Sequence, residues 1–145
     1  MGMATDAGNG CISRYGLCHC AGLAARPLPA RAVQLADNLK ASGSPIVTTR
    51  AVLLEIGAAL AKVSYRGVAV SIIEMLENDP DVEIVAVQNA LFVEAFELFR
   101  ERTDKDWSLT DCMSFVVMRQ RGIQAALSVD THFQQAGFKA LLLET

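Results

Sequence analysis

The stretch WSLTDCMSFVVMRQRGIQAALSVDTHFQQAGF, residues 107–138, has the pattern of an apolar helix followed by a short apolar strand. Asp111 falls in the first turn of the expected helix, and Asp130 closes the expected strand. In open α/β sheets, ligand sites gather where strands end and helices begin. Two acids at the two ends of one helix–strand unit therefore indicate a site that holds a divalent cation or a proton.

The limits of the expected helix are marked by its own residues. Ser108 and Asp111 have the spacing of a capping box, in which each residue satisfies a backbone N–H of the other. Gly122 has the position of the glycine that commonly ends a helix. We therefore expect a helix between Ser108 and Gly122, and then a strand over residues 126–129.

From residue 46 onward, strand patterns alternate with helix patterns. The expected strands cover residues 46–48, 82–87, 126–129 and 140–143. The expected helices begin after the capping residues Thr48 and Thr49, at Val68 after a break at Gly67, at Leu91 and at Ser108. In the helix over residues 91–99, the side chains expected to face inward are Leu91, Ala95, Leu98 and Phe99. Residues 82–87 are nearly all apolar, which is typical of a strand buried on both faces.

This alternation predicts an α/β fold, with a mostly parallel central sheet flanked by helices. The chain has 145 residues, of which 52% are hydrophobic and 20% charged, as expected for one folded domain. The net charge of −3 excludes a strongly basic nucleic-acid-binding protein. No apolar run reaches the roughly 18 residues of a membrane span, and the four cysteines form no convincing disulfide framework. We expect a cytoplasmic protein without a membrane partner.

The first 45 residues have a different character. An α/β domain should open with an apolar strand, but residues 1–20 mix glycine, cysteine and polar residues. A helix pattern resumes at Ala30, in ARAVQLADNLKASG. We therefore expect an atypical segment over residues 1–29, with a degenerate first strand, and a single α/β domain over residues 30–145.

Three carboxylates stand at or near expected strand–helix edges: Glu55, Asp111 and Asp130. Carboxylates held together repel one another, and Mg²⁺ or Mn²⁺, which prefers oxygen ligands, relieves that repulsion. A metal held there can activate water for attack on a phosphodiester. Structural roles are the alternative: Asp111 and Asp130 have positions of helix-capping acids, and Glu55 has the spacing to pair with Lys62.

Several separate motifs resemble those of PIN-domain ribonucleases, above all the VapC-type toxins of bacterial toxin–antitoxin pairs. They are VTTRAVLLEIGAAL (residues 47–60), TDC (residues 110–112) followed by SFVVM, and SVDTHFQQAGF (residues 128–138). The resemblance runs from Ala30 to the end of the chain, with order and spacing kept. It implies a PIN-like fold and a metal-dependent endoribonuclease that hydrolyses RNA phosphodiester bonds as the toxin of such a pair.

The resemblance also assigns roles to residues. Glu55, Asp111 and Asp130 would be metal-binding catalytic acids with Mg²⁺ (or Mn²⁺) as the cofactor. Ser108 and Thr110 would shape the site, and Cys112 would pack in the core. The implied partners are an RNA substrate, a cognate antitoxin protein and a second copy of the chain in a homodimer.

The N-terminus departs from the family pattern. The family opens with a hydrophobic strand that ends in Asp, and the nearest candidate for this fourth metal-binding acid is Asp6, which no apolar strand precedes. One hypothesis is that residues 1–29 are an altered reading of the ancestral start. The alternative function is then a catalytically impaired PIN-fold remnant that retains only dimer and antitoxin binding.

Other residues with chemical potential have simpler interpretations. The cluster of Cys11, Cys18, His19 and Cys20 is too tightly spaced for a structural zinc site and lacks a second ligand pair. A receiver-like phosphoacceptor domain would need an acid pair after the first strand, which is missing.

Two aromatic side chains near the acids also have two interpretations each. His132 is interpreted as structural rather than as a general base, since no motif places a nucleophile beside it. Trp107 is interpreted as a loop anchor rather than an RNA-stacking residue. The basic side chains that could frame an RNA path, but are ordinary on solvated faces, are Arg50, Lys62, Arg66, Arg100, Arg102, Arg119 and Arg121.

Overall fold

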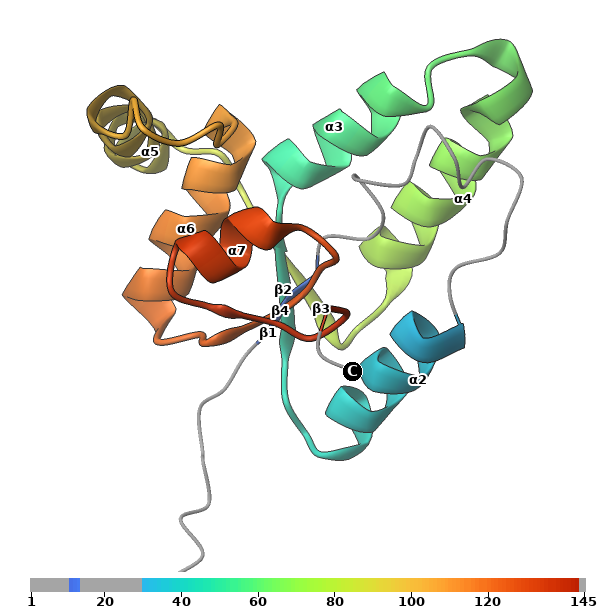
Figure 1. Cartoon of the computed structure of the whole chain (residues 1–145). Helices are drawn as coiled ribbons and strands as arrows, with labels where there is room; N and C mark the ends of the chain where they lie inside the picture. The colour runs from blue at the N-terminus through green and yellow to red at the C-terminus, as the bar shows by residue number, and fades with distance from the viewer. Residues whose placement is uncertain (1–10, 14–29, 144–145) are drawn as a thin grey trace, which may run out of the picture.

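The computed structural model describes residues 11–13 and 30–143, with side chains from residue 34 onward (Figure 1). These residues form a parallel five-stranded sheet with the order β3-β2-β1-β4-β5. The strands are β1 (Cys11–Ser13), β2 (Ile46–Thr49), β3 (Val82–Val85), β4 (Ala125–Leu127) and β5 (Lys139–Ala140). The α/β class and the parallel sheet expected from the sequence are therefore confirmed.

Helices cover both faces of the sheet. They are α2 (Ala30–Ala41), α3 (Arg50–Ala59), α4 (Val63–Asn78), α5 (Asn89–Glu101), α6 (Leu109–Arg121) and α7 (Thr131–Gln135). In Figure 1, α5, α6 and α7 lie on one side of the sheet and α2 and α4 on the other, while α3 projects from the end of β2. Alternate strand residues face the two layers: Val47 and Ala126 pack with α6, and Ile46 and Leu127 pack with α2.

Helix α6 is the most deeply buried element of the described chain, with an unbroken run of buried residues over 111–118. Phe115 is fully buried, and its ring packs edge-on against Trp107 and Phe133 at centroid distances of 4.9 Å and 5.1 Å. Trp107 in turn donates its indole N–H to Gln135 Oε1 at 3.0 Å. This aromatic cluster fixes α6 against α7, and it confirms Trp107 as a buried anchor.

Several local predictions are confirmed. Thr49 caps α3 by accepting a hydrogen bond from the Val52 N–H, and Ser108 and Asp111 form the expected capping box at the start of α6. Gly122 ends α6 with a φ of +65°, in the left-handed region that favours glycine.

Other local predictions are wrong, each for a tertiary reason. Gly67 does not break the chain but lies inside α4, since an internal glycine costs only about 1 kcal/mol relative to alanine and α4 gains more by packing on α3. Phe99 was expected to face inward but is 44% exposed. At 3.6 residues per turn, Leu98 lies two turns after Leu91 and on the same face of α5 as Leu91 and Ala95, so that Leu98 packs against the core and Phe99 points away from it. The last strand ends at Ala140, where the Leu143 N–H closes a turn on its carbonyl.

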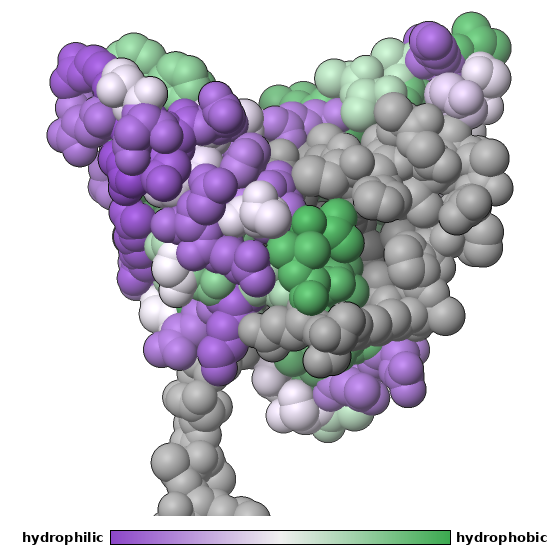
Figure 2. Space-filling model, in the orientation of Figure 1, coloured by the Kyte–Doolittle hydropathy of each residue, from purple (hydrophilic) through white to green (hydrophobic). Residues whose placement is uncertain are grey.

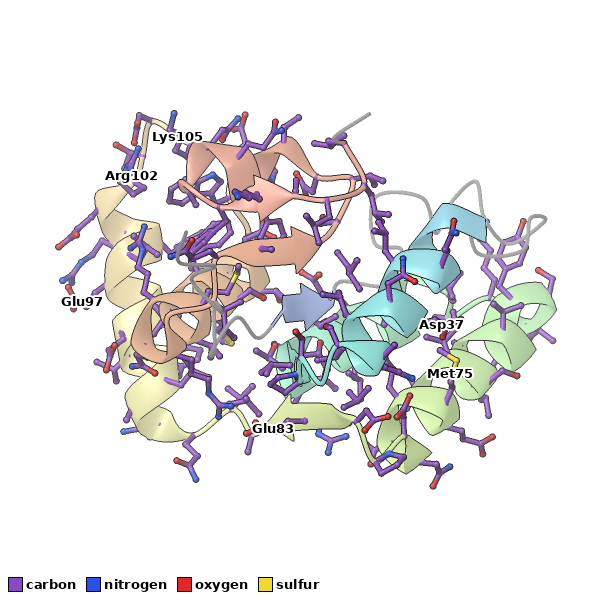
Figure 3. All side chains as sticks on the ribbon, turned by 90° about the horizontal axis from the view of Figure 1, so that it is seen from below. Asp37, Met75, Glu83, Glu97, Arg102 and Lys105 are labelled. Carbon is purple, nitrogen blue, oxygen red and sulfur yellow. The ribbon has the colours of Figure 1, made fainter. Side chains whose placement is uncertain are left out.

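Strand β3 is not buried on both faces as expected. It is the edge strand beside β2, and only partly buried along its length. Glu83 lies on this outer edge (Figure 3) and forms a bidentate ion pair with Arg121 at the end of α6, at 2.5 Å and 2.7 Å. The apolar run of the sequence therefore reflects packing of Val82 and Ile84 against α3 and α4, and of Val85 against the cluster around α6.

Strand β1 comes from the segment expected to be atypical. It occupies the middle of the sheet, pairing with β2 on one side and β4 on the other. Asp6, which precedes β1 in the sequence, and residues 18–20 lie outside the described residues. The division of the chain at residue 30 stays a prediction.

None of the helices in residues 30–143 combines the length and the apolar character that crossing a membrane would require.

The aromatic cluster predicts a large effect of Phe115→Ala. The substitution removes a fully buried ring that contacts three aromatic side chains, and truncation of such a ring typically costs about 3–5 kcal/mol. The free energy of unfolding, measured by urea denaturation, should fall by that amount. Phe99→Ala, at a 44% exposed position, is the matched control and should change it by less than about 1 kcal/mol. Equal effects of the two substitutions would contradict the packing described above.

The contact between α2 and the turn after α4 predicts a pH-dependent contribution to stability. Lys40 and Asp79 form an ion pair, and the hydrogen bond from Lys40, helped by the Asp81 N–H, lowers the pKa of Asp79. The pair should therefore contribute fully above the ordinary aspartate pKa of about 3.9, and its contribution should disappear as the pH falls through the lowered pKa of the folded state.

The measurement is the free energy of unfolding of the wild type and of Asp79→Asn between pH 7 and pH 3. The variant should be less stable by up to about 1 kcal/mol at pH 7, and the difference should shrink below about pH 4. Asp81→Asn removes an exposed carboxylate from the same turn and is the control. A difference between wild type and Asp79→Asn that is constant over the whole range would contradict the linkage.

Candidate metal centre

The N-terminus of α6 positions Asp111. The Asp111 N–H donates to Ser108 Oγ at 3.0 Å, and Asp111 Oδ2 accepts the Ser108 N–H at 3.0 Å. These reciprocal bonds fix the side-chain rotamer of Asp111, which is only 1% exposed. A buried carboxylate is thereby held at the start of the central helix.

The end of β4 positions Asp130. Its N–H donates to Ser128 Oγ at 3.0 Å, and its Oδ1 accepts the His132 N–H at 2.9 Å, so that Asp130 caps α7. The residue is 7% exposed. As in other open α/β sheets, the carboxyl end of a strand and the start of a helix place this acid at the site.

His132 lies between the two acids. Its Nδ1 is 3.1 Å from Asp111 Oδ2 and 3.3 Å from Asp130 Oδ1. One side-chain donor atom from each of the three residues lies within 4.8 Å of the others. Nδ1 is therefore within hydrogen-bond distance of Asp111 Oδ2 and close to Asp130 Oδ1. The sequence-based interpretation of His132 as a purely structural residue missed this contact, although its position in the first turn after Asp130 was a signal for it.

Glu55 and Thr110 lie beside this group rather than in it. Ser108 Oγ is 3.5 Å from Glu55 Oε1, so that one hydroxyl joins α3 to the capping box of α6. Glu55 and Thr110 also line a groove of about 670 Å³ that continues along Leu54 and Phe92. Of the predicted acids, the structure brings Asp111 and Asp130 together and places Glu55 next to them through Ser108.

The capping and the clustering of the acids are compatible. Asp111 and Asp130 both cap helices, as the structural alternative proposed, and both also face His132. Two nearly fully buried carboxylates so close together repel unless a positive charge compensates them. Their oxygens, and the imidazole nitrogen beside them, are ligand atoms that divalent cations accept. The residues present therefore fit a divalent cation.

Cys112 follows Asp111 on α6 but faces the core. It is a free thiol and fully buried. Burial raises the pKa of Cys112 to about 11, with a smaller contribution from the Asp111 charge. The thiol is therefore protonated and unreactive near neutral pH, which confirms the expected packing role.

Comparison with known proteins identifies the class. The model of the PIN domain family matches residues 21–139, so the chain belongs to the PIN-domain family. Its structure is similar to the crystal structure of Mycobacterium tuberculosis VapC20, described as a sarcin-ricin loop cleaving toxin, with a TM-score of 0.69 and 28% sequence identity. That match covers 90% of this chain and 97% of the VapC20 chain. A search of curated proteins finds no match.

These comparisons confirm the resemblance to PIN-domain proteins of the VapC type that the sequence motifs indicated. The family match begins at residue 21, upstream of the helix pattern at Ala30. The family's nucleases depend on divalent metals, in agreement with the acids and the histidine that gather at the carboxyl end of β4.

The geometry predicts that the protein is stabilised by divalent cations and that Asp130→Asn abolishes this effect. Asparagine keeps a side-chain oxygen that can cap α7 but removes the charge. Mn²⁺ or Mg²⁺ at 100 times its dissociation constant should stabilise the wild type by about 2.7 kcal/mol, which for a chain of this size raises Tm by roughly 5–10 °C.

The measurement is Tm by circular dichroism with and without the cation. Without the cation, Asp130→Asn should have a Tm at or above that of the wild type, because the neutral amide removes the repulsion with Asp111. The cation should then change the Tm of the variant little. Glu101→Gln, which removes an exposed acid on α5, is the control and should keep the full response. A full response in Asp130→Asn would show that this carboxylate does not hold the cation.

Proposed function

We propose that the protein is a metal-dependent endoribonuclease that hydrolyses RNA phosphodiester bonds and acts as the toxin of a toxin–antitoxin pair. The observation that carries the proposal is the group of Asp111, Asp130 and His132 at the carboxyl end of β4, in a chain of the PIN-domain family. The similarity over nearly the whole chain to VapC20, an RNA-cleaving toxin by its description, supports the choice of RNA and of the toxin role.

Within this proposal, Glu55, Asp111 and Asp130 are the metal-binding catalytic acids, Ser108 and Thr110 are supporting residues, and residues 30–145 make up the PIN-like domain. Ser108 supports two acids at once, because it caps α6 beside Asp111 and its hydroxyl contacts Glu55. Asp6 is the candidate for a fourth acid. The proposed cofactor is a divalent cation, Mg²⁺ or Mn²⁺.

The chain's own residues account for how a phosphodiester would be bound. A divalent cation supplies Lewis-acid chemistry, which activates water and stabilises the leaving oxygen. Burial of Asp111 and Asp130 excludes bulk water around their carboxylates and strengthens the attraction for a cation. Of the three acids, Glu55 also lines the groove that Arg50 and Thr110 border.

Most of the basic side chains considered as an RNA path are engaged with neighbours. Arg50 pairs with Glu77, Arg100 with Glu97, Arg102 with Asp104 and Arg121 with Glu83. The Arg102 guanidinium holds the pKa of Asp104 at about 2. These pairs favour the structural interpretation of those residues, and they support a substrate bound mainly through the metal centre.

The proposed partners are a cognate antitoxin and a second copy of the chain. Large apolar side chains are exposed on α5 and on the helix pair α3 and α4, where Figure 2 shows apolar surface. They are Phe92, Val93, Phe96 and Phe99 on α5, and Leu54, Val63, Val68, Val70 and Met75 on or beside α3 and α4. Contiguous exposed apolar surface marks protein-binding sites. Because such an enzyme must reach cellular RNA, we place it in the cytoplasm.

A specific observation favours the alternative, a PIN-fold remnant that binds partners without cleaving RNA. No Asp or Glu occurs between Asp6 and Asp37, so no acid follows β1 before α2 begins. The family pattern places an acid at the end of the first strand. Activity then depends on whether the remaining ligands suffice.

The test is cleavage of RNA by the purified full-length protein, with added Mg²⁺ or Mn²⁺ and with a chelator. The substrates are a total RNA pool and a synthetic sarcin-ricin stem-loop, chosen because VapC20 is described as cleaving that loop. We expect metal-dependent cleavage by the wild type. Asp111→Asn, which can keep the helix cap, and Glu55→Gln should each reduce the rate at least about 100-fold, since even residues that only orient metal ligands contribute 10–100-fold.

Glu101→Gln is again the matched control and should cleave at the wild-type rate. Cleavage that persists in Asp111→Asn would point to a contaminating nuclease or to a different site. Folded wild-type protein that binds the cation but cleaves no RNA would support the partner-binding remnant.

A further inference from the structure

We propose that His132 Nδ1 is a direct ligand of the divalent cation, and that this nitrogen makes the site favour Mn²⁺ over Mg²⁺. The inference deepens the proposed function and rests on it. Three observations lead to it: the distances within the side-chain group, the chemistry of its donor atoms, and the absence of an acid after β1 in the sequence.

The distances match those between neighbouring ligands of one ion. Ligands at about 2.1 Å from an octahedral cation, at right angles to one another, lie about 3 Å apart. Nδ1 is 3.1 Å from Asp111 Oδ2 and 3.3 Å from Asp130 Oδ1. The spacing of these three donor atoms is therefore compatible with ligands of one ion.

The backbone holds His132 in this place. It is the second residue of α7, and its own N–H donates to Asp130 Oδ1 at 2.9 Å. Its side chain is 26% exposed, so that the imidazole is partly open to solvent. A cation bound through Nδ1 would require the neutral imidazole with its proton on Nε2.

The donor set decides which metal is preferred. Mg²⁺ takes oxygen ligands almost exclusively, whereas imidazole is a ligand for transition metals. No acid lies between Asp6 and Asp37 to add an oxygen from the end of β1. Even with Glu55 as a third carboxylate, a site that includes an imidazole is less suited to Mg²⁺ than a site of oxygens alone, whereas Mn²⁺ accepts both kinds of donor.

The test is pulsed electron paramagnetic resonance of Mn²⁺ bound to the full-length protein, prepared once with ¹⁴N-histidine and once with ¹⁵N-histidine. A histidine ligand gives a nitrogen coupling that changes with the isotope, and this readout needs no substitution at the site. The chain has only two histidines, so His19→Ala is the matched control and should keep the coupling. His132→Ala should lose it.

Metal affinity gives the second readout. His132→Ala should weaken Mn²⁺ binding roughly 10-fold or more and Mg²⁺ binding much less, so that the ratio of the two affinities falls. Bound Mn²⁺ without histidine coupling in the wild type would overturn the assignment and leave the proposed metal site intact; His132 would then only position the acids. Failure of the wild type to bind either cation would overturn the metal site itself, and the present inference with it.

Discussion

The reciprocal hydrogen bonds between Ser108 and Asp111 are the constraint on which the structure of the site depends. They start α6, the helix with the longest buried run in the described part of the chain, and they fix the direction of the Asp111 carboxylate. Because the aromatic cluster around Phe115 packs α6 against its neighbours, the Asp111 carboxylate is held by a well-packed part of the core. One local motif therefore serves both folding and chemistry.

Strand direction brings the second acid to the first. All five strands are parallel, so that their carboxyl ends meet at one edge of the sheet. Asp130 follows β4 at this edge, and the short helix that it caps turns His132 toward Asp111. Burial of two carboxylates is unfavourable without a compensating cation. The fold thus brings two buried carboxylates and an imidazole together in a chain of a family whose nucleases depend on divalent metals.

Local sequence patterns predicted the elements well where residue chemistry acts over a few positions. The capping box, the left-handed Gly122 and the strand–helix alternation all depend on neighbours in the chain. The errors occurred where distant segments decide. Gly67 is kept helical by packing between α3 and α4, and β3 is an edge strand because of the order of the sheet, although its sequence is apolar.

The sequence by itself determined the α/β class, the parallel sheet and the family, because hydrophobic periodicity and spaced motifs follow from local geometry. It also named Glu55, Asp111 and Asp130 as candidates. Only the tertiary structure decided that Asp111 and Asp130 both lie next to His132, while Glu55 contacts the Ser108 hydroxyl. The physical reason is that distances of a few ångströms between side chains 21 residues apart (Asp111 and His132) or 53 residues apart (Glu55 and Ser108) depend on how helices pack on the sheet. No local sequence pattern records that packing.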